Sequence, residues 1–337
     1  MVAVTYHADL KEVQCNEELA RLLGVERGGT PFDRLAWWQG LVSHCGIDPL
    51  LAVASDGDDR MVLPLRIDGG RMAALGNWYS FHVRPVASTG ANIPSLLTAI
   101  ASDLPSRTRR LTFTGLPGED GSAEGLAAAF RSSGWLVFSE PWANNHIVCI
   151  NGRSFAQYLE ARPGALRTTL KRKAGKLDCQ VLDRFDAKVW ADYEAIYASS
   201  WKPAEGSPAF LREFAEAEGT AGRLRLGIAR AGDQPVAAQL WTVEGHTAFI
   251  HKLAHLESAR PLSPGSVLSA AMFAHAIDRD RVGMIDFGTG DDRYKRDWME
   301  QVRRRYRLDM FRPAHPANWP AIVRAFAGNL ARRGNHG

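Results

Sequence analysis

Residues 285–299, IDFGTGDDRYKRDWM, concentrate reactive side chains around the end of a short apolar run. Two adjacent carboxylates, Asp291 and Asp292, precede Tyr294, and Asp286 lies within the apolar run itself. Carboxylates and a phenol in one segment can exchange protons with a substrate. The adjacent aspartates would alternatively bind an ammonium group or cap the helix that carries Tyr294. The segment therefore predicts acid–base chemistry at the exit of a strand.

A loop upstream, RPLSPGS from Arg260 to Ser266, opens the apolar segment VLSAAMFAHAIDRD, which predicts a helix. Free backbone N–H groups and the positive end of the helix dipole favour an anion there, such as a pyrophosphate. Gly265 lies in this loop, and Ser263 or Ser266 as an ordinary N-cap explains the same pattern equally well.

The apolar segment HTAFIHKLAHLE, residues 246–257, predicts a strand that carries two histidines. A period of two places His251, Leu253 and His255 on one face of this strand and Lys252 on the other. His251 has a pKa range suited to a general base, although a structural histidine is an equal alternative. A spacing of four suits a metal pair only on a helix, so we expect no metal site.

The elements that must position these residues alternate between strands and helices in both halves of the chain. In the N-terminal half, a helix at 31–42 precedes three strands at 49–55, 61–67 and 71–77. A helix, a strand, a helix and one or two strands follow, up to residue 150. The C-terminal half contains helices, three strands, the loop, a helix, a strand and a last helix. This order predicts an α/β fold with mixed sheets.

Length and charge set the frame for these elements. A chain of 337 residues is about twice the usual domain length, which predicts two domains. Residues 1–150 hold 12 Lys and Arg against 16 Asp and Glu, whereas the remainder holds 29 against 21. The C-terminal half is therefore expected to face an anion, which would be a phosphate, a nucleic acid or a lipid headgroup, unless its basic residues form only a solvated face.

Cysteines and the chain start bear on the compartment. The four cysteines show neither CxxC spacing nor the density of a disulfide scaffold, which favours a reducing environment. The N-terminal segment lacks the basic and apolar regions of a signal peptide, and no run of about 18 apolar residues occurs. We expect a cytoplasmic protein that is at most peripheral on the inner face of the membrane.

The order of these segments resembles the GCN5-related N-acyltransferase (GNAT) superfamily. Three strands, a loop of the R-x-x-G-x-G type that opens a helix, a strand and a tyrosine-bearing helix carry the resemblance, with Ser263 at the place of the first glycine. The motifs LRTTLKRKAGKL, SSWKP, AAQLW, HKLAH, LSPGSVLSA and DFGTGDDRYKRDWM resemble more closely the Fem-like branch, with a BioF2-like or cellulose-biosynthesis-type acetyltransferase domain. This resemblance implies two tandem GNAT-like domains, a degenerate one at 1–148 and an acyltransferase domain at 149–312, followed by a tail at 313–337.

The resemblance also implies roles for individual residues. Tyr294 would donate a proton to the leaving thiolate, and His251, Asp286, Asp291 and Asp292 are candidates for the base or for binding the amine. Acyl-CoA would be the co-substrate, with no metal. Its phosphates would be held by residues of the loop and by two lysines: Arg260, Ser263, Gly265, Ser266, Lys202 and Lys295.

The acceptor is an amine whose nature stays open between two alternatives. The motifs SSWKP, HKLAH and SPGSVL also resemble the bacterial ceramide synthase group, which implies a long-chain (sphingoid) base or another lipid amine of the cell envelope. The cellulose-biosynthesis-type resemblance implies an amino sugar in surface-polysaccharide synthesis. A third alternative is a protein that binds acyl-CoA without catalysis.

Two basic segments bear on the partners. No aromatic residue interrupts the basic helix expected within 163–177, so we expect CoA phosphates or an anionic membrane surface there rather than nucleic acid. The tail combines Trp319, Ile322, Val323, Phe326 and Leu330 with Arg324, Arg332 and Arg333 in an amphipathic pattern. It would lie on a membrane interface or dock on its own domain.

Overall fold

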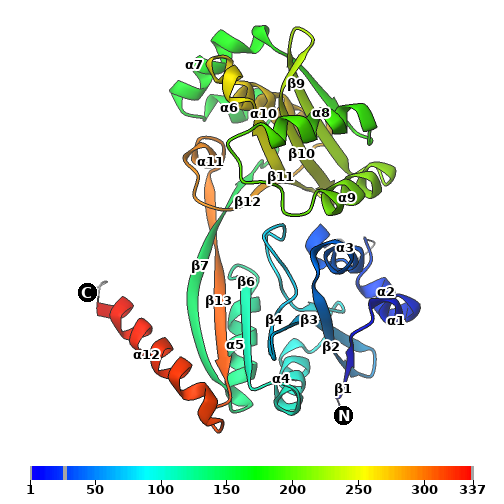
Figure 1. Cartoon of the computed structure of the whole chain (residues 1–337), viewed down its shortest axis with the longest axis vertical. Helices are drawn as coiled ribbons and strands as arrows, with labels where there is room; N and C mark the ends of the chain where they lie inside the picture. The colour runs from blue at the N-terminus through cyan, green and yellow to red at the C-terminus, as the bar shows by residue number, and fades with distance from the viewer. Residues whose placement is uncertain (1, 26–28, 335–337) are drawn as a thin grey trace. The chain divides into compact units, whose positions relative to one another are not determined.

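The computed structural model describes residues 2–25 and 29–334, with side chains up to residue 328 (Figure 1). The chain divides into two compact units. Unit 1 consists of the N-terminal residues, Pro31–Ala143 and the C-terminal segment from Arg303, and unit 2 consists mainly of Asn144–Val302.

Unit 1 is a mixed sheet with the strand order β1-β2-β3-β4-β6-β13. Neighbouring strands are antiparallel except β4 and β6, which are parallel. Helices α4 and α5 pack their apolar residues on one face of this sheet. The elements are β1 (Ala3–His7), α1 (Leu10–Cys15), α2 (Glu17–Leu22), α3 (Leu35–Cys45), β2 (Asp48–Asp56), β3 (Asp59–Asp68), β4 (Arg71–Ala74), β5 (Val86–Ala87), α4 (Ile93–Asp103), β6 (Arg110–Pro117), α5 (Ser122–Ser132), the start of β7 (Leu136–Cys149), β13 (Gln301–Phe311) and α12 (Trp319–Gly334).

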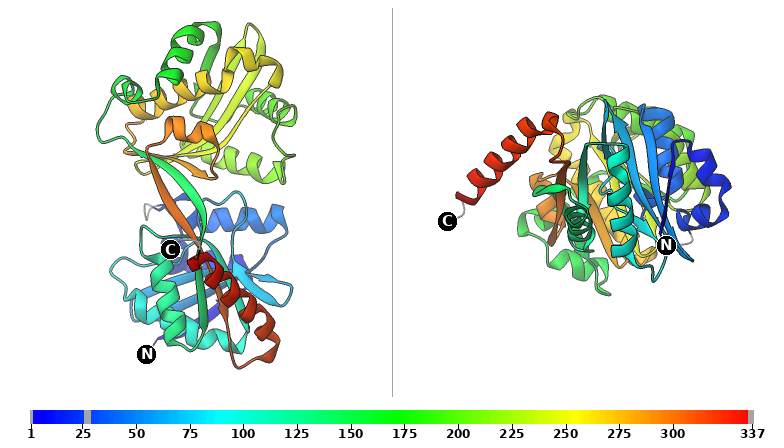
Figure 2. Two further views of the ribbon diagram at one scale, coloured as in Figure 1. Left: turned by 90° about the vertical axis from the view of Figure 1, so that its left-hand side faces the viewer. Right: turned by 90° about the horizontal axis from the view of Figure 1, so that it is seen from below.

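Unit 2 repeats this plan with the strand order β7-β12-β11-β10-β9-β8 (Figure 2). Only β11 and β12 run parallel. Helices α6, α7 and α10 share one apolar cluster on one face of the sheet, and α8 and α9 cover the other. The elements are the end of β7, α6 (Phe155–Glu160), α7 (Gly164–Lys173), β8 (Asp178–Leu182), α8 (Ala187–Ala198), α9 (Pro208–Thr220), β9 (Leu224–Ala231), β10 (Gln234–Glu244), β11 (Thr247–His255), α10 (Pro264–Ala274), β12 (Met284–Thr289) and α11 (Arg293–Trp298).

The prediction of an α/β fold with mixed sheets in two units is confirmed. The change of unit after Ala143 lies five residues before the expected boundary at 148/149. Residues from Arg303 onward belong to unit 1, so they form neither the end of the second domain nor a separate tail. The reason is β13, which pairs antiparallel with β6, from Arg305 with Pro117 to Phe311 with Arg110.

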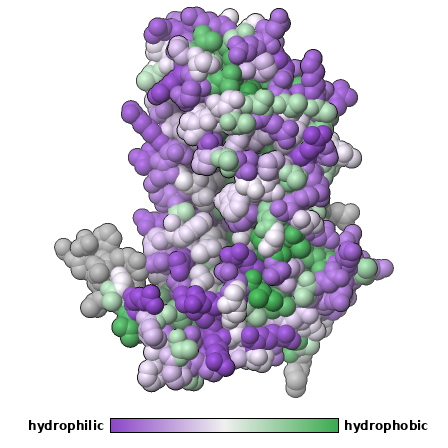
Figure 3. All heavy atoms as spheres, in the orientation of Figure 1, coloured by the Kyte–Doolittle hydropathy of each residue, from purple (hydrophilic) through white to green (hydrophobic). Residues whose placement is uncertain are grey.

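Because residues from Arg303 onward belong to unit 1, the basic residues divide between the units differently than expected. Unit 2 holds 21 Lys and Arg against 20 Asp and Glu, whereas residues 303–337 alone hold eight basic residues against one acidic residue. The basic excess expected around the second domain therefore lies mostly in the segment that completes unit 1. Figure 3 shows hydrophilic residues over most of the visible face of each unit, with hydrophobic patches between them. No helix in the described part of the chain is both long and apolar enough to span a membrane.

Candidate active site

Two parallel strands of unit 2 separate toward their carboxyl ends. β11 and β12 pair from Thr247 with Met284 to Phe249 with Asp286, and β11 then continues to His255 without further pairing to β12. The space outside the carboxyl ends of parallel strands is a common place for a ligand. The residues that line this space in unit 2 are therefore candidates for an active site.

A bulge in β11 changes which side chains face this space. Leu240 pairs with Lys252 but Trp241 pairs with Ile250, so His251 is an extra residue in β11. The Nε2 atom of His251 lies 2.8 Å from Oγ1 of Thr242, and its ring packs edge-on against Phe214 of α9 at 5.1 Å. Bulges re-aim side chains next to functional sites.

The expected alternation along β11 is consequently wrong. Lys252 pairs with Glu205 at 2.7 Å on the face of α8 and α9, and His251 lies on that same face. Leu253 and His255 lie on the α10 face, where both approach Gly265. A period-two count cannot detect the extra residue, because the bulge shifts every later side chain by one position.

A cavity of about 370 Å³, here called the α10 pocket, lies between β11, the start of α10 and α11. It brings together five of the predicted site residues from two separate motifs: Arg260, Ser263, Gly265, Ser266 and Tyr294. Trp201, Leu253, His255, Pro264, Ser269 and Trp298 complete the lining. The structure thus places the predicted anion loop and the predicted acid in one cavity.

The loop before α10 presents backbone N–H groups to this cavity. Ser263 adopts a left-handed conformation with φ 52° and ψ 49° and precedes Pro264 at the first helical position. Among the residues that the structure describes, no side chain caps α10, so the N–H groups of Gly265 and Ser266 have no partner within the first helical turn.

Close packing explains why residue 265 is a glycine. A Cβ atom there would lie 3.2 Å from Cδ2 of His255. Lys173 of α7 donates hydrogen bonds to the carbonyl of Pro261 at 2.7 Å and to Oγ of Ser263 at 3.0 Å, which brings a positive charge to the loop. Arg260 is 80% exposed at the rim. This loop therefore fits a polyanion such as a pyrophosphate.

Tyr294 stands on the short helix α11 with its ring 5.6 Å from that of Phe287. Burial, the charge of Asp292 and a hydrogen bond with Asp292 raise the pKa of Tyr294, so the phenol carries its proton. Asp292 occupies the N-cap position of α11 but makes no side-chain cap bond, so the expected cap is wrong for Asp292. Its carboxylate faces Tyr294 instead.

Asp291 and Asp286 are held by β7. Asp291 accepts a hydrogen bond from Asn144 and pairs with His146, each at 3.1 Å, and these two contacts lower the pKa of Asp291. Asp286 is buried, and its Oδ1 accepts from Asn145 at 3.0 Å and from the N–H of Gly288 at 2.7 Å. These contacts fix the turn after β12, and neither aspartate lines the α10 pocket.

Lys295 and Lys202 are placed elsewhere than expected for ligands of CoA phosphates. Nζ of Lys295 is buried and donates to the carbonyls of Phe287 at 3.1 Å and Gly288 at 3.5 Å. Burial lowers the pKa of Lys295 to about 8. Lys202 lines a second cavity, and its neighbour Trp201 lines the α10 pocket.

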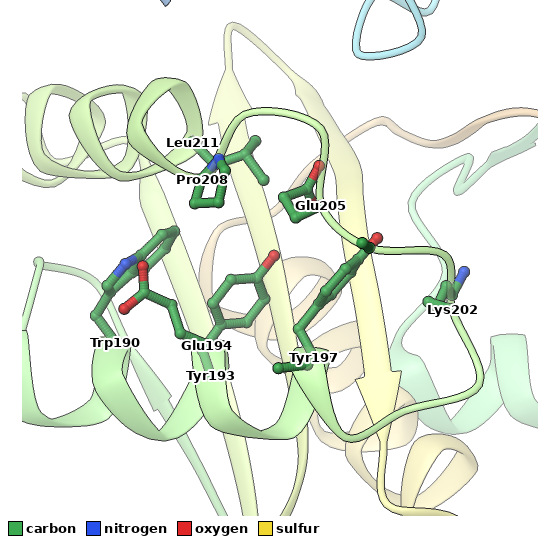
Figure 4. A pocket seen from close by; sticks show the side chains of 10 residues that line it. Trp190, Tyr193, Glu194, Tyr197, Lys202, Glu205, Pro208 and Leu211 are labelled. Atoms are coloured by element: carbon green, nitrogen blue, oxygen red, sulfur yellow. The ribbon is translucent and has the colours of Figure 1, made fainter.

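This second cavity, here called the α8 pocket, has a volume of about 440 Å³. In Figure 4 the rings of Tyr193 and Tyr197 rise from α8 toward the loop that carries Glu205. The remaining lining residues are Trp190, Glu194, Ala198, Lys202, Ala204, Pro208 and Leu211. Burial, the charge of Glu205 and a hydrogen bond with it raise the pKa of Tyr197 to about 12. The pocket is thus apolar and aromatic with acidic groups.

Residues 153–296 match the family model of the acetyltransferase (GNAT) domain. This segment is therefore similar to a GNAT domain. It contains the α10 pocket except for Trp298, and all of the α8 pocket. No curated protein matches the chain significantly.

Solved structures extend the likeness beyond this segment. The C-terminal domain assigned to a lysylphosphatidylglycerol synthetase from Agrobacterium fabrum is 13% identical, with a TM-score of 0.57 over 95% of this chain and 96% of that one. FemX is 10% identical, with a TM-score of 0.57 over 91% and 96%. A tandem GNAT protein from the clavulanic acid biosynthesis pathway is 12% identical, with a TM-score of 0.54 over 92% and 98%. These likenesses concern the fold, which has two GNAT-like units.

Several residues in or beside the two cavities of this segment are absent from the predicted site. Trp201 packs against His255 in a tilted arrangement with ring centroids 4.3 Å apart, and Lys173 reaches the loop from α7. Trp201 belongs to the SSWKP motif, which was a usable signal, whereas nothing in the sequence links Lys173 to Ser263. Trp190, Tyr193 and Tyr197 have the helical spacing of core residues, and Trp190 and Tyr193 are buried as such a pattern predicts. Their spacing cannot reveal that they also wall a cavity.

Proposed function

We propose that the protein is an N-acyltransferase that moves an acyl group from acyl-CoA to a primary amine. One observation carries this proposal. The uncapped start of α10 and the protonated Tyr294 line the same cavity between separating parallel strands. An anchor for a phosphorylated donor and a proton donor thus lie where a thioester could extend from one to the other.

The donor would bind with its pyrophosphate at Gly265 and Ser266 and its pantetheine arm along the unpaired part of β11. The helix dipole, Lys173 and Arg260 favour the negative charge. His255 lies beside Gly265, at this phosphate end. It is therefore too far along the pocket to serve as the base for the amine, and we assign it to donor binding.

The chemistry requires one proton to leave the amine and one to reach the sulfur. The neutral amine attacks the thioester carbonyl, the C–S bond then breaks, and the Tyr294 hydroxyl gives its proton to the thiolate. His251 is the proposed base, because the bulge turns it to the α8 and α9 face from which the acceptor would approach; it lines neither cavity itself. Asp292 orients the Tyr294 hydroxyl as a positioning residue.

The acceptor would enter through the α8 pocket. Aromatic faces and the carboxylate of Glu194 suit an ammonium group attached to an apolar body, whereas Glu205 is already paired with Lys252. Trp201 and Lys202 are adjacent residues that line the two cavities, so donor and acceptor would meet at this loop. These features favour a lipid amine, such as a long-chain base whose amino end enters the pocket, over a polar amino sugar.

Two measurements test the proposal. A ligand that binds only the folded state raises the melting temperature, so acyl-CoA thioesters of increasing chain length should raise it by several degrees. Arg260→Ala should reduce this shift. Turnover should then be measured as release of free CoA thiol with a long-chain base, glucosamine and a simple aliphatic amine as acceptors.

The outcomes separate the alternatives. Thiol release with the long-chain base but not with glucosamine supports the lipid acceptor, and the reverse result supports the amino sugar. A thermal shift without turnover on any amine would contradict catalysis and leave an acyl-CoA-binding protein. No shift with any thioester would contradict the CoA donor, and an aminoacyl-tRNA donor would then be the first to test.

A further inference from the structure

Four arginines surround one cavity in unit 1, remote in sequence from the GNAT-like segment. The cavity has a volume of about 440 Å³ and is here called the arginine pocket. Its arginines come from four elements, with Arg71 at the start of β4, Arg110 at the start of β6, Arg307 on β13 and Arg324 on α12. Such convergence of like charges from distant parts of the chain has no role in the proposed acyl transfer.

Strand register explains why these residues share one face. Arg110 pairs with Phe311 in the antiparallel ladder between β6 and β13. Leu111 and Met310 point into the core beneath α4 and α5, so alternation sends Arg110 and Phe311 to the opposite face. There α12 contributes to the lining of the cavity, and its Phe326 packs edge-on against Phe138 at 4.9 Å.

The charges inside the pocket do not balance. Its lining contains four arginines and two carboxylates, Glu140 and Asp309, which leaves a net charge of +2. Asp309 is already engaged, because it accepts two hydrogen bonds from Arg307, at 2.8 and 3.1 Å, and one from Thr112 at 2.7 Å. Within the described part of the chain, Arg71, Arg110 and Arg324 form no ion pair.

Arg110 is the most constrained of these three. Its guanidinium lies over the ring of Phe311 at 5.0 Å, and its Nε is buried without a hydrogen-bond partner among the described residues. Burial and the like charges of Arg71, Arg307 and Arg324 lower the pKa of Arg110, against the opposing charge of Asp309. An anion in the pocket would offset the repulsion among these like charges.

We infer that the arginine pocket binds a phosphate-bearing anion, held by Arg71, Arg110 and Arg324. Guanidinium forks match phosphate oxygens in pairs, and the cavity has room for a ligand that carries further atoms beside a phosphate group. A phospholipid headgroup and a soluble phosphorylated compound share this chemistry. A headgroup would place the exposed Trp319 and Val323 of α12 beside the membrane interface.

The experiment uses the whole chain and two probes. Calorimetry with inorganic pyrophosphate reports the soluble source, and co-sedimentation with vesicles of phosphatidylglycerol or of phosphatidylcholine alone reports the headgroup. Arg110→Gln and Arg324→Gln each remove one pocket charge, and Arg324 lies on an exposed helix face where the change does not threaten folding. Arg304→Gln is the matched control, because it removes one exposed positive charge of β13 outside the pocket.

We expect at least one probe to bind, with both pocket variants weakening it by about tenfold and the control leaving it unchanged. Pyrophosphate binding with equal affinity for both vesicles would assign a soluble ligand, whereas binding specific to phosphatidylglycerol would assign a headgroup. Pyrophosphate could also occupy the start of α10, so only the part lost in Arg110→Gln counts. The inference is overturned if neither probe responds to the pocket variants, or if Arg304→Gln weakens binding as much as they do.

Discussion

The two units share the same order of strands, but the space beside the parallel strands is filled in unit 1 and open in unit 2. In unit 1, β4 and β6 pair only at Met72 with Leu111 and at Ala73 with Thr112. The chain after β4 then returns to β6, where the N–H of Val83 donates to the carbonyl of Gly115 at 3.1 Å. In unit 2 the corresponding space beside β11 stays open as the α10 pocket.

Side-chain hydrogen bonds hold the segment of unit 1 that follows β4 and returns to β6, called the returning segment. Asp33 is buried and accepts hydrogen bonds from both Nε and Nη2 of Arg84, the latter at 2.7 Å, while Nε2 of His82 lies 3.3 Å from its Oδ1. Trp37 donates to Ser80 at 3.1 Å. Unit 1 thus fills with its own chain the space that unit 2 leaves open as the α10 pocket, which gives a physical meaning to its description as degenerate.

The largest expected effect is on turnover, and it should distinguish Tyr294 of unit 2 from Tyr79 of unit 1. Tyr294→Phe should lower turnover by about a thousandfold, because the thiolate then leaves without its proton donor, while acyl-CoA affinity changes by less than about threefold. Tyr79→Phe, in the returning segment of unit 1, should leave both unchanged. Steady-state kinetics and acyl-CoA titration check this pair. If acyl-CoA binding collapses in Tyr294→Phe while turnover of the bound complex survives, Tyr294 is not the acid.

Sequence reasoning found the parts of this site that depend on local chemistry. The turn at Gly265 and the helix with Tyr294 are short-range features, and the structure brings both to one cavity. It missed what depends on distant pairing. β13 was not predicted, because arginines crowd its sequence, although Tyr306, Leu308 and Met310 alternate with charged residues as in a strand. The burial of Lys295 against backbone carbonyls likewise could not be predicted from the sequence.

A second prediction concerns the buried carboxylate of Asp33 in unit 1. Asp33→Asn should reduce the free energy of unfolding by about 3 kcal/mol, since it leaves buried positive charge without its counter-ion. Asp120→Asn removes a more exposed partner of Arg84 and should cost less than about 1 kcal/mol. Urea unfolding of both variants measures the difference. Equal losses would show that Asp33 does not hold the segment.

The stability that Asp33 provides should depend on pH in a defined direction. His82 and Arg84 lower the pKa of Asp33 against the opposing effect of burial, so this group stabilises the fold above its unfolded pKa of about 3.9. Its contribution is lost as the pH falls below about 4. The stability difference between the wild type and Asp33→Asn should therefore shrink from pH 7 toward pH 3, and a constant difference would contradict the lowered pKa.

The smallest expected effects on stability concern the N-termini of α4 in unit 1 and α10 in unit 2. In α4 the side chain of Asn92 accepts from the N–H of Ser95 at 3.2 Å, so unit 1 caps the helix that unit 2 leaves open. Asn92→Ala should cost about 1 kcal/mol and leave the acyl-CoA thermal shift intact. Ser263→Gly relieves a left-handed serine but loses the bond from Lys173, so stability should change by less than about 1 kcal/mol.

Asn92→Ala and Ser263→Gly, together with a third variant, Ser263→Val, report on which helix start binds the donor. Ser263→Gly keeps the N–H groups of Gly265 and Ser266 and the left-handed turn, so the acyl-CoA shift should survive. Ser263→Val keeps the same helix but forces a β-branched residue into the left-handed region, so it should weaken the shift at similar secondary-structure content. Loss of the shift in Asn92→Ala but not in Ser263→Val would move the donor to unit 1, because only a helix start that contacts the donor can change its affinity.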